Sequence, residues 1–307
     1  MGTEQAKIYQ HHTPRQYLLP WADSDERVAW YGHDRVMRSG LTRVGGENDF
    51  YKLKELTVPD VDCMKLFIDG LPELGRKVHK RFLQMYILPT RLKRHLEKRG
   101  DCGPDAMRLV DVLRSNFMEN YHASVESGFW PYLDLIKARD FSFIEDLNKA
   151  SEFFHGFSVQ YMRTKAVKER ARALQKTNVL FDDVERVWDV LSYIIAVEMG
   201  RSLFADRRNF QILVLDNDTQ IPFITSDQPI VNIRADAGSF NPPEKIELYY
   251  PLSPTQAMLY LENATPTAGI SQSVSIDEAH RYNMLILDHR AFCVFSNSEE
   301  YLSLLNR

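Results

Sequence analysis

The sequence predicts an α+β fold, in which N- and C-terminal strands form a mostly antiparallel sheet and a large helical insertion occupies the middle. Three observations support this prediction. Residues 1–60 have the pattern of short strands and turns, residues 61–205 that of helices, and residues 206–307 that of strands with one helix. Helices grouped between two strand-containing ends are typical of α+β folds, whereas doubly wound α/β folds alternate strand and helix. No Pro-, Gly- or Ser-rich linker separates the parts, so we expect a single domain over residues 1–307.

In the N-terminal part, the segment VAWYGHDRVM (28–37) places two short apolar runs on either side of a glycine-containing turn. This pattern predicts a β-hairpin. The pair Gly45 and Gly46 predicts a further turn.

The helical part contains the segment PELGRKVHKRFLQMYIL (72–88), whose side chains separate into two faces at a period of about 3.6 residues. The apolar face comprises Val78, Phe82, Met85 and Tyr86, and the basic face comprises Arg76, Lys77, Lys80 and Arg81. Pro89 is expected to end or kink this helix, and Gly100 to end a second one.

Farther along, Ser142 and Glu145 have the spacing of a capping box, which predicts a helix that runs to about Gln175. Asp182 or Asp183 is expected to start the next helix. After Phe204 the pattern changes to that of strands. We predict strands at residues 210–215, 221–227, 246–252, 257–262 and 291–296, with a helix at residues 276–287.

The composition is that of an ordinary globular protein. Of the 307 residues, 44% are hydrophobic and 26% are charged, which argues against disordered and collagen-like chains. Cys63, Cys102 and Cys293 are too scattered for a disulfide framework and include no C-x-x-C pair. No apolar run reaches the roughly 18 residues of a membrane span, and residues 1–21 contain no signal-peptide core. We therefore expect a cytoplasmic protein with no membrane partner.

Well-known catalytic and binding motifs are missing from the sequence. It contains no phosphate-binding glycine loop, H-E-x-x-H zinc helix, EF-hand loop, G-x-S-x-G elbow or kinase signature. His11 and His12 are adjacent, and adjacent side chains on a strand point to opposite faces, which argues against a shared metal ion. The metal and the cofactor therefore stay unknown at this level.

Positive charge is concentrated in two stretches, although the formal net charge of the chain is −4. Residues 76–99 contain nine Lys or Arg against one Glu, and residues 163–176 contain six against one. Such clusters attract phosphate backbones. In the first stretch the candidate nucleic-acid-binding residues are Arg76, Lys77, Lys80, Arg81, Arg91 and Arg94. The alternative is a solvated helix face, because few aromatic residues are interleaved there to stack on bases.

Five sequence blocks, spread over nearly the whole chain, carry a resemblance to a known family. They are HHTPRQYLLPW (11–21), ENDFY (47–51), QYMRT (160–164), FITSDQPI (223–230) and YYPLSP (249–254). Their order and spacing resemble those of a mainly bacterial family catalogued as domain-of-unknown-function family 4238, with Trp21 where that family more often has Phe. The resemblance implies a common fold and supplies no established reaction.

Polar side chains in these blocks form the candidate catalytic set, which consists of His11, His12, Glu47, Asp49, Gln160, Arg163 and Asp227. If these residues lie together in one pocket, Arg163 could bind a phosphate. Asp49 and Asp227 could then position a metal ion or a water molecule. A histidine could then act as acid or base. Gln160 and Arg163 lie three residues apart, so a helix would place them on one face.

The same residues also have a structural interpretation. Asp227 lies in a Ser-Asp-Gln-Pro sequence that favours a turn or a helix cap, where its carboxylate would accept backbone N–H bonds. Pro14 and Tyr17 could lock the N-terminal strand in place. Arg163 could form a buried ion pair with Glu47 or Asp49.

Three classes of function remain as hypotheses. The first is a nucleic-acid-acting effector, a nuclease or phosphodiesterase that serves bacterial defence or a mobile element. The second is a non-enzymatic module that contacts a protein partner or a second copy of the chain through the basic face and the aromatic residues Tyr17, Trp21, Trp30 and Tyr31. The third is an enzyme that acts on a phosphorylated small molecule or nucleotide, with Arg163 as the anion clamp.

Overall fold

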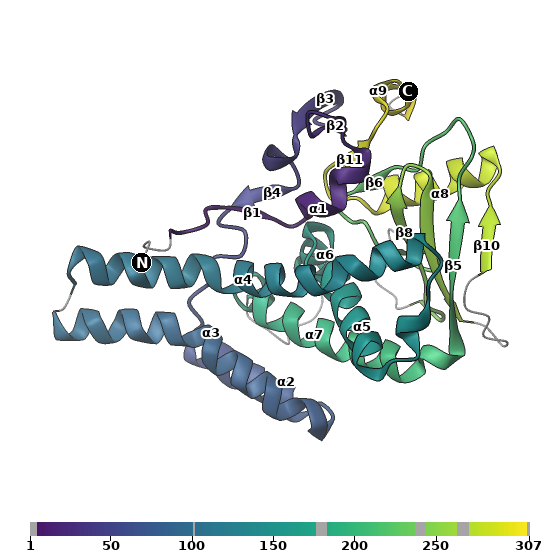
Figure 1. Ribbon diagram of the computed structural model, residues 1–307. Coiled ribbons are helices and arrows are strands. Elements are labelled where there is room, and N and C mark those ends of the chain that lie inside the picture. Colours follow the sequence, from purple (N-terminus) through teal and green to yellow (C-terminus); the bar gives the residue numbers. More distant parts are fainter. Residues whose placement is uncertain (1–4, 101, 176–182, 237–242, 263–269, 306–307) are drawn as a thin grey trace.

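The computed structural model describes residues 5–100, 102–175, 183–236, 243–262 and 270–305 (Figure 1). Its N-terminal strands lie next to the C-terminal part of the chain, and the helices that connect the two lie to one side (Figure 1). Strands from both ends of the chain form one four-stranded sheet in the order β3-β2-β11-β6. The prediction of an α+β fold with a central helical region is therefore confirmed.

The N-terminal part consists of short strands and turns, as predicted. β1 (Tyr9–His11) pairs antiparallel with β4 (Gly46–Asn48), and β2 (Arg27–Gly32) pairs antiparallel with β3 (Arg35–Gly40). The predicted hairpin turns at His33 and Asp34, which both have positive φ angles, as tight two-residue hairpin turns require. Helix α1 (Arg15–Leu18) and two 3₁₀ helices, Leu19–Trp21 and Leu41–Arg43, complete this part.

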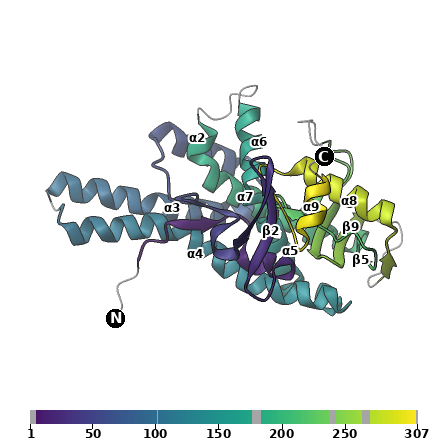
Figure 2. The ribbon, with the colours of Figure 1, turned by 90° about the horizontal axis from the view of Figure 1, so that it is seen from above.

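Six helices form the middle of the described chain: α2 (Val58–Asp69), α3 (Glu73–Arg99), α4 (Pro104–Lys137), α5 (Leu147–Met162), α6 (Lys165–Gln175) and α7 (Val184–Asp206). Two of the predicted end signals are confirmed, since Asp183 caps α7 and Gly100 ends α3 in a left-handed conformation. α3 and α4 lie side by side as an antiparallel pair that extends away from the sheets in both views (Figure 1, Figure 2).

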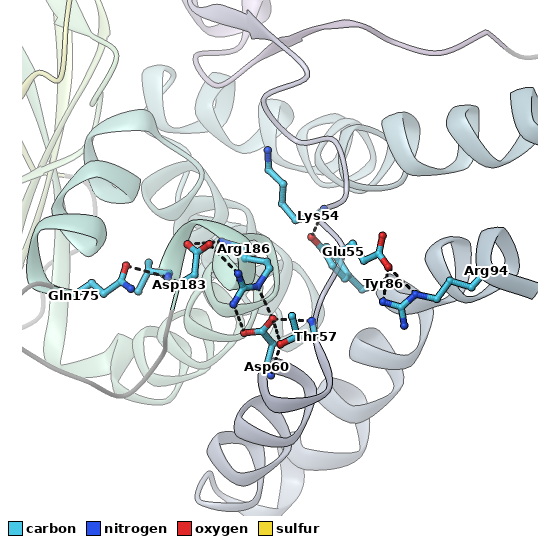
Figure 3. A network of polar contacts seen from close by, with 10 residues as sticks. Lys54, Glu55, Thr57, Asp60, Tyr86, Arg94, Gln175, Asp183 and Arg186 are labelled. Atoms are coloured by element: carbon cyan, nitrogen blue, oxygen red, sulfur yellow. Dashed lines mark hydrogen bonds and ion pairs between the residues drawn. The ribbon is translucent and has the colours of Figure 1, made fainter. Parts of the chain in front are cut away.

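A polar network fixes α2 against α7. Arg186 of α7 donates to both carboxylate oxygens of Asp60 in α2, at 2.6 and 3.0 Å (Figure 3). Asp60 also closes a capping box with Thr57 at the start of α2, and Asp183 accepts a further bond from Arg186 at 3.1 Å. A bidentate Arg–carboxylate pair fixes orientation as well as distance, so this contact sets how the two helices cross.

The C-terminal part is a five-stranded sheet in the order β10-β5-β9-β8-β7. Its strands are β5 (Phe210–Asp216), β7 (Val231–Asn232), β8 (Glu247–Ser253), β9 (Gln256–Glu262) and β10 (Ile270–Ser273). All neighbours pair antiparallel except β10 and β5, which are parallel. The remaining elements are β6 (Thr225–Ser226), α8 (Ile276–His289), β11 (Val294–Ser296) and α9 (Glu299–Leu305).

Alternate residues of this sheet pack into two different cores. Tyr250 and Tyr260 belong to the core that contains Phe154 and Phe157 of α5. Tyr249, next to Tyr250, faces the opposite way and stacks on Tyr282 of α8 at 4.6 Å between ring centroids. Because successive strand side chains point to opposite faces, apolar residues at every position bury both faces of the sheet between α5 and α8.

Two predictions about α3 need correction. Of the two outcomes expected at Pro89, an end of the helix is wrong, because α3 is a single helix of 27 residues with Pro89 buried inside it. Val78 and Met85 are 53% and 47% exposed, so they are not part of the buried face that Phe82 and Tyr86 belong to. α3 packs against α2, α4 and α7, and Val78 and Met85 lie outside the faces that these contacts bury.

Two further predictions fail at the ends of elements. Ser142 begins a 3₁₀ helix, and the helix after it starts at Leu147, capped by Asp146, and ends at Met162 rather than near Gln175. The strand predicted at residues 221–227 shrinks to Thr225–Ser226. Asn283 accepts the Ile224 N–H at 3.0 Å, so a side chain replaces the expected strand partner there.

The described residues contain no helix that combines the length and the apolar character needed to cross a membrane.

Candidate ligand-binding pocket

A cavity of about 360 Å³ lies where the N-terminal strands, the start of α6 and the segments beside β6 and β11 come together. Its buried floor is formed by His12, Val44, Asp227 and Cys293. Glu47 and Lys165 form a charged wall, and Tyr9, Trp30, His33, Arg43 and Phe292 surround the opening. The volume falls within the range of roughly 300–1,000 Å³ that is typical of small-molecule sites.

Asp227 is fully buried in the floor, and backbone amides surround its carboxylate. Oδ1 accepts the N–H of Ala291 at 2.9 Å, and Oδ2 accepts those of Phe292 and Cys293 at 2.8 and 3.1 Å. Burial raises the pKa of Asp227 to about 6, although these amides and the charge of Lys165 act in the opposite direction. Asp227 therefore holds the 291–293 segment in place and titrates close to neutral pH.

Lys165, the first residue of α6, forms an ion pair with Glu47 of β4. The two side chains are 26% and 44% exposed, so the pair lies at the wall of the pocket and is open to ligands. Burial acts to lower the pKa of Lys165, but its hydrogen bond to Glu47 and the charge of Glu47 raise that pKa above its ordinary value. Lys165 is thus a permanent cation, positioned at the N-terminus of a helix, where backbone N–H groups also favour anions.

His12 is 5% exposed and packs on the ring of Phe50, at 5.0 Å between centroids. Burial, together with the nearby charges of Lys165 and Arg163, lowers the pKa of His12 to about 3. At neutral pH the imidazole is therefore uncharged. One ring nitrogen lies 3.4 Å from the hydroxyl of Thr13.

Arg163 lies behind the pocket, because its guanidinium is used to join the helices to the N-terminal strand. It pairs with Glu126 of α4, donates to the backbone oxygen of His11, and donates to the Tyr51 hydroxyl at 3.2 Å. Tyr51 in turn donates to the backbone oxygen of Arg163 at 2.9 Å. The buried ion pair is thus made with Glu126, and neither Glu47 nor Asp49 takes part in it.

The residues that follow Arg163 connect two more of the sequence blocks. The Thr164 hydroxyl donates to the side chain of Gln228, next to Asp227, and Lys165 binds Glu47. At the junction of α5 and α6, Arg163 therefore binds β1, Thr164 binds the Ser-Asp-Gln-Pro turn, and Lys165 binds β4.

Of the seven candidate catalytic residues, His12, Glu47 and Asp227 line the pocket, and the other four do not. Asp49 is a positive-φ residue whose side chain is 47% exposed and lies 3.8 Å from Lys52. Gln160 is buried, and its Nε2 atom has no hydrogen-bond partner in the described structure. His11 likewise leaves its buried Nε2 atom without a partner, and burial lowers the pKa of this histidine.

Several pocket residues are absent from the candidate set predicted from the sequence. Lys165 directly follows the QYMRT block, so its position next to Arg163 and Thr164 is a signal that could have identified it. Tyr9 lies two residues before the first block, and Cys293 enters the sequence predictions only as a candidate for disulfides and zinc. The sequence around Phe292, His33 and Arg43 contains no motif that could have indicated a pocket.

Two of the proposed interface aromatics belong to the core. Tyr17 and Trp21 are 3% and 1% exposed. The Trp21 indole donates to the backbone oxygen of Phe223 at 2.8 Å, and the Tyr17 hydroxyl donates to that of Pro251 at 2.8 Å. Buried aromatics with a satisfied polar group stabilise the fold, so this block cannot offer the surface that the interaction hypothesis assumed.

The candidate nucleic-acid-binding residues of α3 are partly engaged within the chain. Lys80 pairs with Asp69, Arg94 pairs with Glu55, and Arg76 donates to the backbone oxygen of Leu71 at 2.6 Å. Lys77, Arg81 and Arg91 are exposed and form no ion pair with any described residue. None of the six lines the pocket.

Within the described ranges, no group of three or more His, Cys, Asp or Glu side chains is arranged to hold a metal ion. The pocket contains five such residues, but Asp227 faces backbone amides and Glu47 faces Lys165. The donors are therefore directed to other partners and do not converge on one point.

The chain matches the model of a known family. The model of a family described as "Protein of unknown function (DUF4238)" matches residues 9–300. The chain belongs to this family. The match contains all five sequence blocks, which confirms the resemblance. No curated protein and no solved structure matches the chain.

Proposed function

We propose that this family member is an enzyme that acts on a phosphorylated small molecule bound in the pocket. The observation that supports this most directly is the position of Lys165, a partly exposed cation at the start of a helix and at the wall of a small cavity. Lysine side chains and helix N-termini both favour phosphate. Lys165 takes the role of anion anchor that the sequence suggests for Arg163, whose donors are occupied.

The surroundings of Lys165 account for both binding and proton transfer. Arg43 is exposed at the opening and adds a second positive charge. An incoming phosphate would compete with Glu47 for Lys165, since both are anions. Asp227 is the candidate for proton transfer, because a pKa of about 6 lies near the operating pH, where acid–base catalysis is most efficient.

Phosphate binding tests the first half of this proposal. In calorimetric titrations with inorganic phosphate, we expect Lys165→Met to lower the affinity about tenfold or more, because a charge-assisted hydrogen bond is lost. Glu47→Gln should raise the affinity, since Lys165 is then released from its partner. The control is Lys65→Met, which removes an exposed lysine that pairs with Asp62 on α2. Equal affinity in wild type and Lys165→Met would contradict the proposal.

Turnover tests the second half. Release of p-nitrophenol from p-nitrophenyl phosphate and from bis(p-nitrophenyl) phosphate separates monoesterase from diesterase activity. We expect the activity to depend on Lys165. We also expect the rate to change most steeply near pH 6, where Asp227 ionises. Phosphate binding without turnover of either ester would leave a binding protein and remove the enzymatic part.

A second candidate function is action on nucleic acid, as a nuclease or phosphodiesterase in bacterial defence or in a mobile element. It is supported by the exposed Lys77, Arg81 and Arg91 on the projecting helix α3. Binding of DNA or RNA through these residues should weaken steeply with salt, and the triple alanine variant should reduce the slope. Salt-insensitive or undetectable binding at low ionic strength would exclude this function.

A further inference from the structure

The opening of the pocket presents aromatic side chains with much of their surface uncovered. Phe292 is 38% exposed and Tyr9 is 36% exposed, and Trp30 is half-buried beside them. Single exposed apolar residues are common, but several gathered around one cavity usually mark a binding site. These side chains come from three separate segments, so only the fold brings them together.

One side of each ring packs closely against the backbone of a glycine. A Cβ atom on Gly32 would lie 2.8 Å from the Trp30 ring and 3.3 Å from the Phe292 ring. A Cβ atom on Gly46 would lie 2.8 Å from the Tyr9 ring. Glycine at both positions therefore allows the rings to pack directly on the backbone.

Phe292 has an additional constraint on its backbone. Its N–H is bound by the buried carboxylate of Asp227 at 2.8 Å, and its ring meets that of His33 edge-on, at 4.6 Å between centroids. A partly exposed ring that is restricted in this way loses less conformational entropy when a ligand binds, which favours stacking.

The aromatic opening and the cation belong to one site. Lys165 Nζ lies 5.8 Å from the centroid of the Phe292 ring. A phosphate on Lys165 and a planar ring on Phe292 would therefore be close enough to be parts of one molecule joined by a sugar. Glu47, exposed at the same wall, is a carboxylate that can accept hydrogen bonds from sugar hydroxyls.

We propose that the ligand is a nucleotide, with its phosphate at Lys165 and its base stacked at the Phe292, Tyr9 and Trp30 opening. This inference rests on the proposed phosphate site and adds the aromatic heterocycle to it. Stacking of bases on aromatic side chains tolerates different bases, so the opening selects for a base without selecting one base strongly.

Three probes separate the two parts of the ligand: adenosine monophosphate, ribose 5-phosphate and adenosine. Calorimetric titration of the wild type should show adenosine monophosphate binding roughly tenfold or more tightly than ribose 5-phosphate. Phe292→Leu should remove most of this difference and leave ribose 5-phosphate binding within about twofold. Tyr9→Leu provides a second variant in case Phe292→Leu fails to fold, as judged by thermal melting. The matched control is Phe204→Leu, which changes a half-buried ring that lies outside the pocket under Arg207.

Each outcome bears on a different proposal. Equal affinities for adenosine monophosphate and ribose 5-phosphate would overturn the nucleotide inference and leave the phosphate site standing. Equal affinities for adenosine monophosphate and adenosine, both lowered by Phe292→Leu, would overturn the phosphate site and leave the aromatic site. Absence of binding by all three probes would overturn both.

Discussion

Asp227 Oδ2 accepts the backbone N–H of Phe292 at 2.8 Å, so the acid in the floor of the pocket fixes the aromatic ring at its opening. The two residues lie 65 positions apart in the sequence. Asp227 thereby has the structural role expected of a Ser-Asp-Gln-Pro turn, and it also lines the floor of the pocket. The structural and the functional interpretations of this residue are compatible with each other.

Replacement of Asp189 by asparagine should change how stability depends on pH. Asp189 is buried in α7, and burial raises its pKa from 3.8 to about 6. The folded state therefore binds the proton more tightly than the unfolded state. The stabilisation that this proton provides is complete below pH 4 and is lost as the pH rises through 6. An asparagine side chain resembles the protonated acid, and its carbonyl oxygen can still accept the Tyr86 hydroxyl.

We therefore expect Asp189→Asn to be more stable than wild type at pH 8, by on the order of 2–3 kcal/mol, with the difference vanishing near pH 4. Urea denaturation at several pH values measures this. Asp227→Asn is the contrasting variant, since the pKa of Asp227 is also about 6. Both oxygens of Asp227 accept backbone N–H groups, so the NH₂ group of an asparagine would face a donor and lower the stability. A constant difference for Asp189→Asn across the pH range would show that its ionisation is not the cause.

Tyr17→Phe should destabilise the protein by about 1–3 kcal/mol, because one buried acceptor, Pro251 O, and one buried donor, the Thr225 hydroxyl, lose their partner. The Tyr17 hydroxyl lies 2.7 Å from the hydroxyl of Thr225 and donates to Pro251 O at 2.8 Å. Tyr249→Phe is a matched control, since the Tyr249 hydroxyl is equally buried and has no partner among the described residues. Urea denaturation should show little or no loss for Tyr249→Phe. Equal losses in the two variants would refute the assigned role of the Tyr17 hydrogen bonds.

Arg163→Met should cost roughly 3–5 kcal/mol, because removing one partner of a buried ion pair leaves the other uncompensated. The uncompensated partner is Glu126, whose side chain is only 19% exposed. Arg15→Met removes an ion pair with Glu26 in which both side chains are about half exposed, and it should cost roughly 0–1 kcal/mol. Chemical denaturation of both variants checks the contrast. A small loss for Arg163→Met, similar to that for Arg15→Met, would argue against its role as a clamp.

Gly156→Ala should destabilise the packing of α5 on α4. A Cβ atom at residue 156 would lie 2.6 Å from the ring of Phe129, which is fully buried. Overpacking of this kind costs about 1–3 kcal/mol, and the better helix propensity of alanine offsets up to roughly 1 kcal/mol. Gly40→Ala is the control, because a Cβ atom there meets nothing within 4 Å. Thermal unfolding should show a lower Tm for Gly156→Ala alone, and unchanged Tm values in both variants would contradict the expected clash.

Local signals in the sequence were sufficient where they act over a few residues. The hairpin around Gly32, the cap at Asp183 and the stop at Gly100 all depend on backbone conformation and capping within one or two turns. The exposed Met85 and the uninterrupted helix at Pro89 were not foreseeable in this way. Both depend on which side of α3 meets α4, and that choice is made by packing between distant segments.

The candidate site shows the same division. Residue type and block order singled out His12, Glu47 and Asp227, which line one pocket, but they also singled out Arg163 and Gln160, which are buried and do not line it. Sequence spacing does not show which side chains at the junction of α5 and α6 face the cavity and which face the core. Of the aromatic residues at the opening, the sequence singled out only Trp30, and as an interface residue; Tyr9 and Phe292 belong to no motif in their own segments.

By itself, the chain's sequence determined the α+β class, the family and most of the helices and strands, since these follow from periodicity, caps and a distributed pattern of residues. Only the tertiary structure decided that Arg163 is buried in an ion pair with Glu126 whereas Lys165 is partly exposed at the cavity, and that the Phe292 ring lies near Lys165. The reason is physical: whether a charge is neutralised or available depends on which groups from elsewhere in the chain are folded against it.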